Sequence, residues 1–391
     1  MTARQKFNST MGRSGGFEIP RTEFAYWAGC FRRWPGEGLA MDMYIPDSVL
    51  DGDIVRGSVS FGTGDPQLEQ SFAGELVDRW VRPLLGMDSY LAKFPFDLSP
   101  RLQKETLEDT KHHRILKDSF GLISKQLKGN AAIHHTMEYP VKDADDFSRY
   151  KELYDTDNFT DRFPAKIEEL RKGLEQRDYP IRLGGNPYGF TFFPRMLMGE
   201  VGYLTALYDA PGLVHDINRF YLDFVKKYWG MILDKIDIDC VFILEDIAYR
   251  NGSMISPNQF REFALPYTEE FADFAKGKGV SQVFVDCDGL ISELIPLWIE
   301  AGVTGIFPIE AVNDIVEIRK KYPVLNLLGG VDKRPLISGG REEINRELER
   351  IRPLLAEGGY IPHIDHAVPE DISWDNFRYY REELNNIIDS M

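Results

Sequence analysis

The chain has 391 residues, of which 43% are hydrophobic and 28% are charged, a composition typical of a globular protein rather than a disordered or fibrous one. Its formal net charge of -16 argues against roles that require binding to nucleic acid or to an anionic membrane, because both need a cationic surface. The length allows one large α/β domain or two ordinary ones.

Cysteine usage and the lack of long apolar segments predict a cytoplasmic protein. Cys30, Cys240 and Cys287 are scattered and odd in number, which fits a reducing compartment better than a disulfide framework. The N-terminal residues contain no apolar core of signal-peptide type, and nowhere do eighteen apolar residues run together. We therefore expect neither secretion nor membrane spanning.

The first half of the chain contains few clear signals. We interpret residues 1 to about 50 as an N-terminal extension and 53-DIVRGSVSF-61 as a candidate strand. The stretch from about 100 to 161 is rich in Lys, Glu and Asp, and we predict a helical insertion there. Because no Ser/Gly linker, low-complexity tract or short-period repeat separates these segments, we expect residues 1–391 to form a single domain.

In the second half, short β-rich runs alternate with longer segments of helical period. A strand followed by a helix, repeated about every 30 to 50 residues, is the pattern of a parallel sheet covered by helices. The G-x-G-x-x-G turn of a doubly wound dinucleotide-binding sheet is missing. We therefore predict an α/β fold of the (β/α)8 TIM barrel type. The six runs are 181-IRLGGNP-187, 239-DCVFILEDI-247, 282-QVFVDCDG-289, 303-VTGIFPIE-310, 324-VLNLLGGVDK-333 and 359-GYIPHIDH-366.

Five segments after these or neighbouring runs are predicted to be helices. Ser256 and Pro257 are expected to be the N-cap and first residue of one of them, with Gln259 completing a capping box. Pro266 lies inside that segment and is expected to kink it. The other four have amphipathic spacing and cover 209–236, 290–301, 342–356 and 373–389.

Polar residues stand at the end of nearly every predicted strand. In a barrel the carboxyl ends of all strands meet on one face, where active sites of this fold are built. A single Asp after a strand more often caps the next helix, but six strands that end this way favour a shared site. The residues are Asn186, Glu245, Asp246, Asp286, Asp288, Glu310, Asp332, Lys333, Asp365 and His366.

The stretch 284-FVDCDGL-290 places two carboxylates at the end of one strand. Because side chains alternate along a strand, Asp286 and Asp288 are expected to point the same way and Cys287 the other way. Adjacent carboxylates repel one another unless a cation, a shared proton or water lies between them. With Glu310 and His366, they are candidate ligands of a divalent metal, zinc or a harder ion.

Structural explanations of the same residues stay open. The two aspartates of the triplet could cap the helix that begins near Leu290. Glu310 could pair with Lys333, and Asp365 and His366 could form a structural hydrogen bond.

Several motifs in order carry a family resemblance. They are 256-SPNQFREFALPY-267, the D-C-D-G strand end with 293-ELIPLWIEAGVTGIFPIE-310, 328-LGGVDKR-334 and 358-GGYIPHIDHAVPEDISWDNFRYY-380, with weaker matches at 187-PYGFTFFPRMLMGE-200 and 209-DAPGLVHDI-217. From about residue 180 onward the chain resembles the uroporphyrinogen decarboxylase superfamily, which includes the haem-pathway decarboxylase and the cobamide-dependent methyltransferases. The resemblance implies a (β/α)8 barrel and suggests a homodimer.

The methyltransferase or O-demethylase branch is the more similar one. It and its methionine synthase relative have a His-x-Cys pair where this chain has Asp286 and Asp288, the synthase places a zinc-binding Glu near the position of Glu310, and His366 stands where a late ligand completes the pattern. Two carboxylates in place of His and Cys weaken the case for a thiol-activating zinc. They leave open a metal that acts as a Lewis acid on an ether or hydroxyl oxygen.

The resemblance thus implies a methyltransferase that moves a methyl group from a small O- or N-methylated substrate to a corrinoid. The corrinoid would arrive on a partner protein, because a D-x-H-x-x-G type of cobalamin-binding signature is missing from this chain. Glu245 or Asp246 would bind substrate or exchange a proton, and Lys333 would neutralise a substrate anion. The further substrate-binding candidates are Asn186, Tyr188, Phe190, Asp332 and Asp365, with the aromatic ones forming either a substrate wall or ordinary core.

Two other functions stay open. A decarboxylase of porphyrin-like or other carboxylated substrates would need no metal, but its arginine motif is poorly matched by 27-WAGCFRRW-34, with Arg32 and Arg33, and an acidic site would repel such a substrate. A binding protein that keeps the barrel and has lost the chemistry would explain the replaced His-x-Cys pair.

Overall fold

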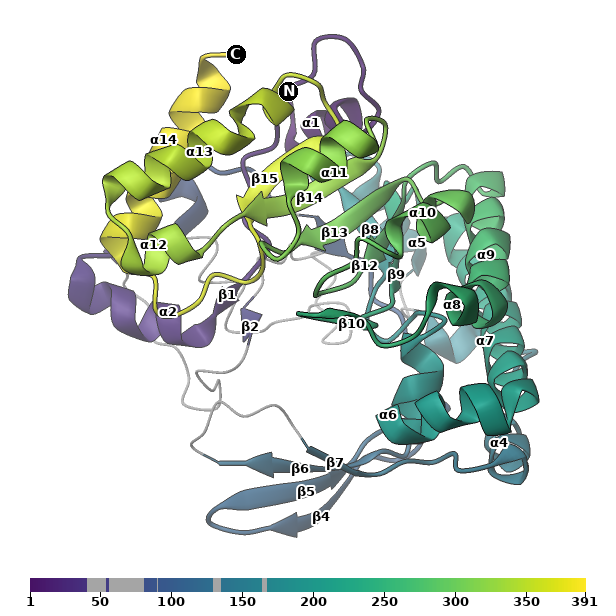
Figure 1. The fold of residues 1–391 in the computed structure, drawn as a ribbon. Coiled ribbons are helices and arrows are strands. Elements are labelled where there is room, and N and C mark those ends of the chain that lie inside the picture. Colours follow the sequence, from purple (N-terminus) through teal and green to yellow (C-terminus); the bar gives the residue numbers. More distant parts are fainter. Residues whose placement is uncertain (41–53, 56–80, 90, 129–134, 164–166) are drawn as a thin grey trace.

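The centre of the molecule is a curled parallel sheet (Figure 1). The computed structural model describes residues 1–40, 54–55, 81–89, 91–128, 135–163 and 167–391. Seven strands pair in the order β15-β14-β13-β12-β9-β8-β3, all parallel. Six of them confirm the six predicted runs, and the seventh is β3. They are β3 (Ala92–Lys93), β8 (Ile181–Gly184), β9 (Cys240–Leu244), β12 (Val283–Asp286), β13 (Gly305–Ile309), β14 (Asn326–Val331) and β15 (Tyr360–Ile364).

The strands are apolar on both faces because both faces are covered, as is usual for parallel sheets. On the outer face, residues such as Val241 and Ile243 pack against helices. On the inner face, the strands contribute a separate apolar group that we call the inner cluster. It contains Phe7, Met11, Phe24, Ala25, Leu91, Cys240, Phe242, Phe284, Phe307, Leu328, Ile361 and Ala367.

The predicted helices are present, some with shifted ends. Ser256 caps α8 (Pro257–Phe263), with Gln259 in a capping box. The helix is interrupted at Ala264, and α9 (Leu265–Gly277) follows. The segment predicted over 290–301 contains only α10 (Ile295–Glu300), preceded by turns. In the described part of the chain, no helix has both the length and the apolarity needed to cross a membrane. The remaining helices are α1 (Ala3–Met11), α2 (Ala28–Arg33), η1 (Trp34–Glu37), α4 (Ala144–Lys151), η2 (Thr160–Arg162), α5 (Ile167–Leu174), α6 (Phe192–Asp209), α7 (Pro211–Leu233), α11 (Ile315–Lys321), α12 (Arg334–Ser338), α13 (Arg341–Leu355) and α14 (Trp374–Asp389).

The sheet has seven strands among the described residues, where the barrel prediction expects eight. An extended segment, 21–27, touches both edges of the sheet. The amide of Asp88, before β3, donates to the carbonyl of Arg21 at 2.7 Å, and the amide of Val368, after β15, donates to the carbonyl of Ala25 at 2.9 Å. Closure into an eight-stranded barrel therefore stays a prediction.

The candidate strand at 53–61 lies mostly outside the described residues. Its described part forms β2 (Ile54–Val55), which pairs antiparallel with β1 (Tyr26–Trp27) rather than joining the large sheet.

The N-terminal helix α1 covers the amino ends of the strands. Arg4 pairs with Asp239, just before β9, at 2.7 Å. The carbonyl of Met11 accepts a hydrogen bond from Asn326 at the start of β14, and Phe7 enters the inner cluster. The described part of the predicted N-terminal extension is thus packed into the body of the molecule.

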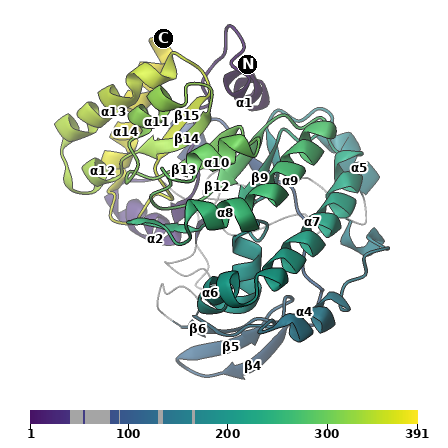
Figure 2. The same ribbon diagram turned by 45° about the vertical axis from the view of Figure 1, so that its right-hand side comes forward.

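The prediction of a helical insertion over 100–161 is wrong for most of its described part. That segment forms an antiparallel sheet that lies below α6 and apart from the curled sheet (Figures 1 and 2), and only α4 follows it as an α-helix. Charged residues such as Lys and Glu suit exposed strands here as well as helices, and turn chemistry decides between them: the Asp118 carboxylate accepts the amides of Phe120 and Leu122, both at 2.9 Å. We call this sheet the insertion sheet, and its strands are β4 (Glu105–Asp109), β5 (His113–Lys117), β6 (Ile123–Leu127) and β7 (His135–Glu138).

Candidate active site

A cavity of about 650 Å³ lies at the carboxyl ends of β9, β12 and β13. Three of its lining residues, Asp246, Asp288 and Glu310, follow these three strands. They meet because neighbouring parallel strands end at the same edge, which is where sites of α/β folds are built. The rest of the described lining comes from α6, from the insertion sheet and from the chain around β10 (Ala248–Tyr249): Leu122, Thr136, Tyr139, Phe192, Arg195, Met196, Glu200, Ala248, Tyr249, Arg250 and Gly289.

Asp288 and His366 form the central pair. His366 Nε2 lies 3.5 Å from Asp288 Oδ2, and the ring of Phe24 meets the imidazole edge-on with 5.6 Å between the ring centres. Burial opposes a positive charge on His366, but the hydrogen bond to Asp288 and the charges of Asp288 and Glu310 outweigh it and raise the pKa of the imidazole. The pair can hold a proton close to the cavity.

The other two carboxylates have pKa values above their ordinary range. Burial is the main cause for both, and the charge of Asp288 adds to it. Glu310 Oε2 accepts the amide of Gly289 at 2.7 Å. Asp246 has a φ of +39°, in the left-handed region that a non-glycine residue seldom adopts, and its carbonyl accepts a hydrogen bond from Arg195. Carboxyls that keep a proton to higher pH are suited to proton transfer.

The predicted metal ligands do not meet as a preformed centre. Asp288 is paired with His366, and Glu310 is engaged by a backbone amide. Throughout the described ranges, no group of three or more His, Cys, Asp or Glu side chains is placed to hold a metal ion. Asp286 ends β12 and is half-buried. The donor set as arranged does not fit a metal, and metal binding by these residues stays a prediction.

The cysteine of the D-C-D triplet points away from the cavity, as expected. Cys287 is fully buried, and its Sγ accepts the amide of Ile247 at 3.4 Å. Burial raises the pKa of this thiol. It is a packing residue.

Glu245 is placed behind the cavity rather than in it. Its side chain is fully buried, accepts the amides of Thr191 at 2.8 Å and Phe190 at 3.3 Å, and also accepts the Thr191 hydroxyl. Burial raises the pKa of its carboxyl to about 7. Of the two acids proposed for substrate binding or proton exchange, only Asp246 lines the cavity.

The remaining polar candidates are engaged with one another or with nearby groups. Lys333 pairs with Asp365 at 3.2 Å, and not with Glu310, while the other Asp365 oxygen accepts the amide of Ala311 at 3.1 Å. Asp332 binds Arg334, which lowers the pKa of its carboxyl despite partial burial. Asn186 is exposed, and its carbonyl accepts a hydrogen bond from Lys93 at 2.8 Å.

The aromatic candidates belong to the core. Tyr188 and Phe190 are each 1% exposed, and the Tyr188 ring packs against Trp229 and Phe271. The backbone places them there, because the carbonyl of Tyr188 accepts the amide of Leu244 and turns this segment behind the end of β9. The substrate wall expected from them is not formed, and Phe192 is the aromatic residue of that run which lines the cavity.

Several cavity residues were missed from the sequence. Arg195 and Glu200 lie on α6, and Glu200 accepts the hydroxyl of Tyr249 at 2.9 Å. Tyr139 follows β7 of the insertion sheet. The sequence carried one usable signal, since Arg195 and Glu200 lie inside the run 187-PYGFTFFPRMLMGE-200 directly after a predicted strand. No local pattern links the insertion to the cavity.

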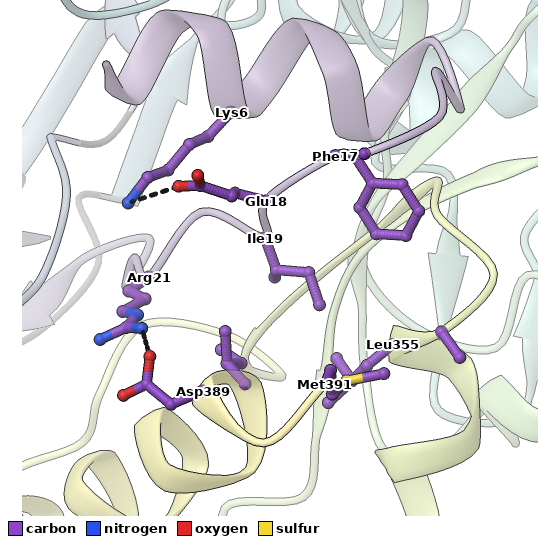
Figure 3. Close-up of a pocket in the computed structure, with 11 residues that line it drawn as sticks. Lys6, Phe17, Glu18, Ile19, Arg21, Leu355, Asp389 and Met391 are labelled. Atoms are coloured by element: carbon purple, nitrogen blue, oxygen red, sulfur yellow. Dashed lines mark hydrogen bonds and ion pairs between the residues drawn. The ribbon is translucent and has the colours of Figure 1, made fainter. Parts of the chain in front are cut away.

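A second cavity, of about 480 Å³, lies between the N-terminal segment and the end of the chain (Figure 3). Its charged side chains face one another in pairs, Lys6 with Glu18 and Arg21 with Asp389. Self-paired charges leave little to recognise a ligand, so the cavity at the carboxyl ends of the strands is the candidate active site.

Comparison with known proteins agrees with this architecture. The model of the family described as uroporphyrinogen decarboxylase (URO-D) matches residues 132–387. No curated protein sequence shows a significant match. Among solved structures, a methyltransferase from Methanosarcina mazei is similar over 100% of this chain and 99% of its own, with a TM-score of 0.57 and 12% identity, a likeness that concerns the fold alone.

Two further structures show weaker similarity. Xylanase B from Clostridium stercorarium F9 has a TM-score of 0.30 and 13% identity, covering 51% of this chain and 71% of its own. A D-tagatose 3-epimerase-like protein has a TM-score of 0.31 and 13% identity, covering 57% and 85%. Scores this low carry no argument about this chain.

Proposed function

Because the chain belongs to the uroporphyrinogen decarboxylase family, we propose that it is an enzyme of methyltransferase type that removes a methyl group from a small O- or N-methylated substrate. The observation that carries the proposal is the Asp288–His366 pair beside Asp246 and Glu310 at one cavity. The full-length likeness in fold to a methyltransferase from Methanosarcina mazei supports it.

Removal of the methyl group requires a proton at the oxygen or nitrogen atom that leaves. When a nucleophile takes the methyl carbon, the bond from that carbon to oxygen or nitrogen breaks, its electron pair stays on the oxygen or nitrogen, and that atom then takes up a proton. His366, whose pKa is raised by the hydrogen bond and charge of Asp288, is the proposed acid. It contacts the lining residue Asp288, and Asp246, on the cavity wall, is the alternative acid. A corrinoid on a partner protein is the proposed methyl acceptor and would supply the nucleophile.

The test uses free cobalamin, reduced chemically, as a stand-in for the partner's corrinoid. The purified chain is incubated with a panel of methoxy-aromatic and N-methylated compounds, and methylcobalamin and demethylated product are quantified. His366→Gln and Asp288→Asn are expected to lose activity by about 100-fold or more, as for removal of a general acid. Asp375→Asn, which changes an exposed carboxylate on α14, is the matched control.

Three results would redirect the proposal. Carbon dioxide release from a porphyrinogen, with no demethylation of any donor, would favour the decarboxylase reading. Ligand binding with neither reaction would favour an inert barrel. One divalent ion per chain in the purified protein, lost in both Asp288→Ala and His366→Ala, would restore the metal centre predicted from sequence.

Decarboxylation of a polycarboxylate stays the weaker candidate. Asp246, Asp288, Glu310 and Glu200 all line the cavity, and a wall with four acidic residues repels such a substrate. In the segment that poorly matches the decarboxylase arginine motif, Arg33 is bound to Glu37 and to the carbonyl of Glu370.

A further inference from the structure

Arg182 is a buried arginine on the inner face of the curled sheet. It lies in β8 and is 4% exposed. Its register partner on β9, Cys240, belongs to the inner cluster, and its guanidinium carbon lies 4.7 Å from the centre of the Phe242 ring. The side chain therefore points inward, unlike its neighbours Ile181 and Leu183, which pack with the outer helices.

Nε and Nη1 of the Arg182 guanidinium are shielded from solvent and have no hydrogen-bond partner among the described residues. Two further arginines are buried in the described part of the chain, and both have partners: Arg319 donates to the carbonyls of Leu325 and Gly359 at 2.9 and 2.8 Å, and Arg381 pairs with Glu23 at 3.0 Å. A buried cation without a counter-charge is costly. Arg182 thus presents an unmatched positive charge to the inside of the sheet.

The guanidinium reaches the edge of the sheet at which the candidate site lies. At Gly185, just past β8, an added Cβ would stand 2.9 Å from Nη1 of Arg182, so the guanidinium lies directly against the carboxyl end of this strand. Lys93 is the register partner of Arg182 on β3, and its Nζ reaches the carbonyl of Asn186 at the same end. Two cations therefore stand at the β3 and β8 side of this edge.

The opposite charge stands at the same edge on the next strands. Asp246, Asp288 and Glu310 follow β9, β12 and β13. One edge of the sheet thus has a cationic side and a carboxylate side. A planar guanidinium fork binds carboxylate or phosphate oxygens through two parallel hydrogen bonds.

We propose that Arg182 is an anion subsite, and that the substrate carries an oxyanion, carboxylate or phosphate, in addition to its methylated group. The oxyanion binds Arg182 while the methylated end faces the carboxylates and His366. That the substrate is methylated rests on the proposed function, whereas the anion subsite does not.

The first experiment uses wild-type protein and two ligands that differ only by a carboxylate. Vanillate carries a methoxy group and a carboxylate, and guaiacol lacks the carboxylate. Isothermal titration is expected to give vanillate an affinity at least about tenfold higher, as a charge-assisted contact provides. Equal affinities for the pair, with no binding of inorganic phosphate, would overturn the proposal. Inorganic phosphate that binds more tightly than vanillate, and displaces it, would support the subsite with phosphate as its anion.

Variants test whether Arg182 causes the difference in affinity between vanillate and guaiacol. Arg182→Met keeps an apolar stem over Phe242 and removes the charge. The affinity for vanillate is therefore expected to fall to about that for guaiacol, while the affinity for guaiacol is unchanged. Arg182→Lys keeps the charge without the fork, and an intermediate advantage is expected. If the advantage disappears in Arg250→Gln, at the cavity rim, and persists in Arg182→Met, the proposal is overturned. Should Arg182→Met not fold, Arg182→Lys and the wild-type ligand pair decide.

The binding experiment contains no methyl acceptor, so it separates the two proposals. Arg182-dependent vanillate binding without any methyl transfer would leave the subsite standing and reject the methyltransferase. Methyl transfer from guaiacol and vanillate with equal efficiency and equal affinity would reject the subsite and leave the methyltransferase standing.

Discussion

At the scale of single residues, two acids that are adjacent in the sequence have different environments. Glu245 is fully enclosed and uses its carboxylate to hold the backbone amides at the start of α6. Asp246, the next residue, lines the cavity. α6 carries Arg195 and Glu200 into the cavity wall, so Glu245 contacts the start of the helix that supplies these two lining residues.

Glu245→Gln is expected to change how stability depends on pH. Burial raises the pKa of Glu245 from 4.5 to about 7. An acid with a raised pKa in the folded state contributes most to stability below its ordinary pKa, and this contribution is lost as the pH rises through about 7. The wild type should therefore lose stability relative to Glu245→Gln between about pH 5 and pH 8, on the order of 1–3 kcal/mol. Urea unfolding at the two pH values measures it, and a difference that stays constant with pH would contradict it.

Asp288→Asn is expected to shift the pH profile of the proposed reaction. Asp288 holds the pKa of His366 above its ordinary value, so the imidazolium persists to higher pH. If this acid donates the proton, kcat/KM falls as the pH rises through the pKa of His366. Without the carboxylate that pKa decreases, and the alkaline limb moves to lower pH. A lower rate with an unmoved limb would show that His366 is not the acid, and Asp375→Asn serves again as the control.

At the scale of elements, the insertion sheet meets the candidate site through an irregularity in α6. Gly199 interrupts this helix with φ 76° and ψ 163°. A Cβ at Gly199 would stand 2.7 to 3.0 Å from the ring of Tyr139, which follows the insertion sheet and lines the cavity. The close approach of backbone and ring needs a residue without a side chain.

Gly199→Ala is expected to loosen the insertion sheet from α6. Both the positive φ and the contact with Tyr139 disfavour alanine, with an expected cost of about 1–3 kcal/mol. Hydrogen exchange over β6 and β7 should increase, and affinity for cavity ligands should fall. Gly202→Ala, one turn further along the same helix, meets only Met198 at an ordinary 3.4 Å and is expected to be neutral or stabilising. Equal effects of the two substitutions would contradict the role assigned to Gly199.

At the scale of the whole molecule, the two ends of the curled sheet are used differently. The amino ends of the strands are closed by α1, which is held by Arg4 and Asn8 on Asp239 and by the entry of Phe7 into the inner cluster. The carboxyl ends carry Asp246, Asp288 and Glu310 and the cavity of about 650 Å³. The contacts of α1 and the candidate active-site residues therefore lie at opposite ends of the strands, an arrangement known from α/β barrels.

Phe7→Ala is expected to destabilise the fold without altering the site directly. Phe7 is 2% exposed, and removing a buried phenyl ring typically costs about 3–5 kcal/mol. Thermal unfolding should show the loss, while ligand affinity measured well below the transition should stay within about twofold. Tyr208→Ala removes an aromatic ring that is 75% exposed and is expected to change stability little. A comparable loss in both variants would contradict a closing role for α1.

Three features could be predicted from the sequence: the six later strands, the capping box at Ser256 and the meeting of Asp246, Asp288 and Glu310. These follow from apolar runs, local turn and cap chemistry, and the rule that parallel strands end together. Local periodicity carries such signals within a few residues. For the charge-rich segment from about 100 to 161, the same reasoning predicted helices where strands form, because exposed strands and exposed helices have similar compositions.

Which polar residues reach the cavity depends on the tertiary fold and could not be predicted from the sequence. Glu245 and Asp246 are adjacent in sequence, yet one is sealed behind α6 and the other lines the wall. Tyr188 and Phe190 turn into the core, while Tyr139 reaches the cavity from the insertion sheet. Arg182 gave no strand-end signal, because it is the second residue of β8 and its side chain reaches the carboxyl end of that strand. Such placements depend on packing between segments far apart in the chain, and no local pattern encodes them.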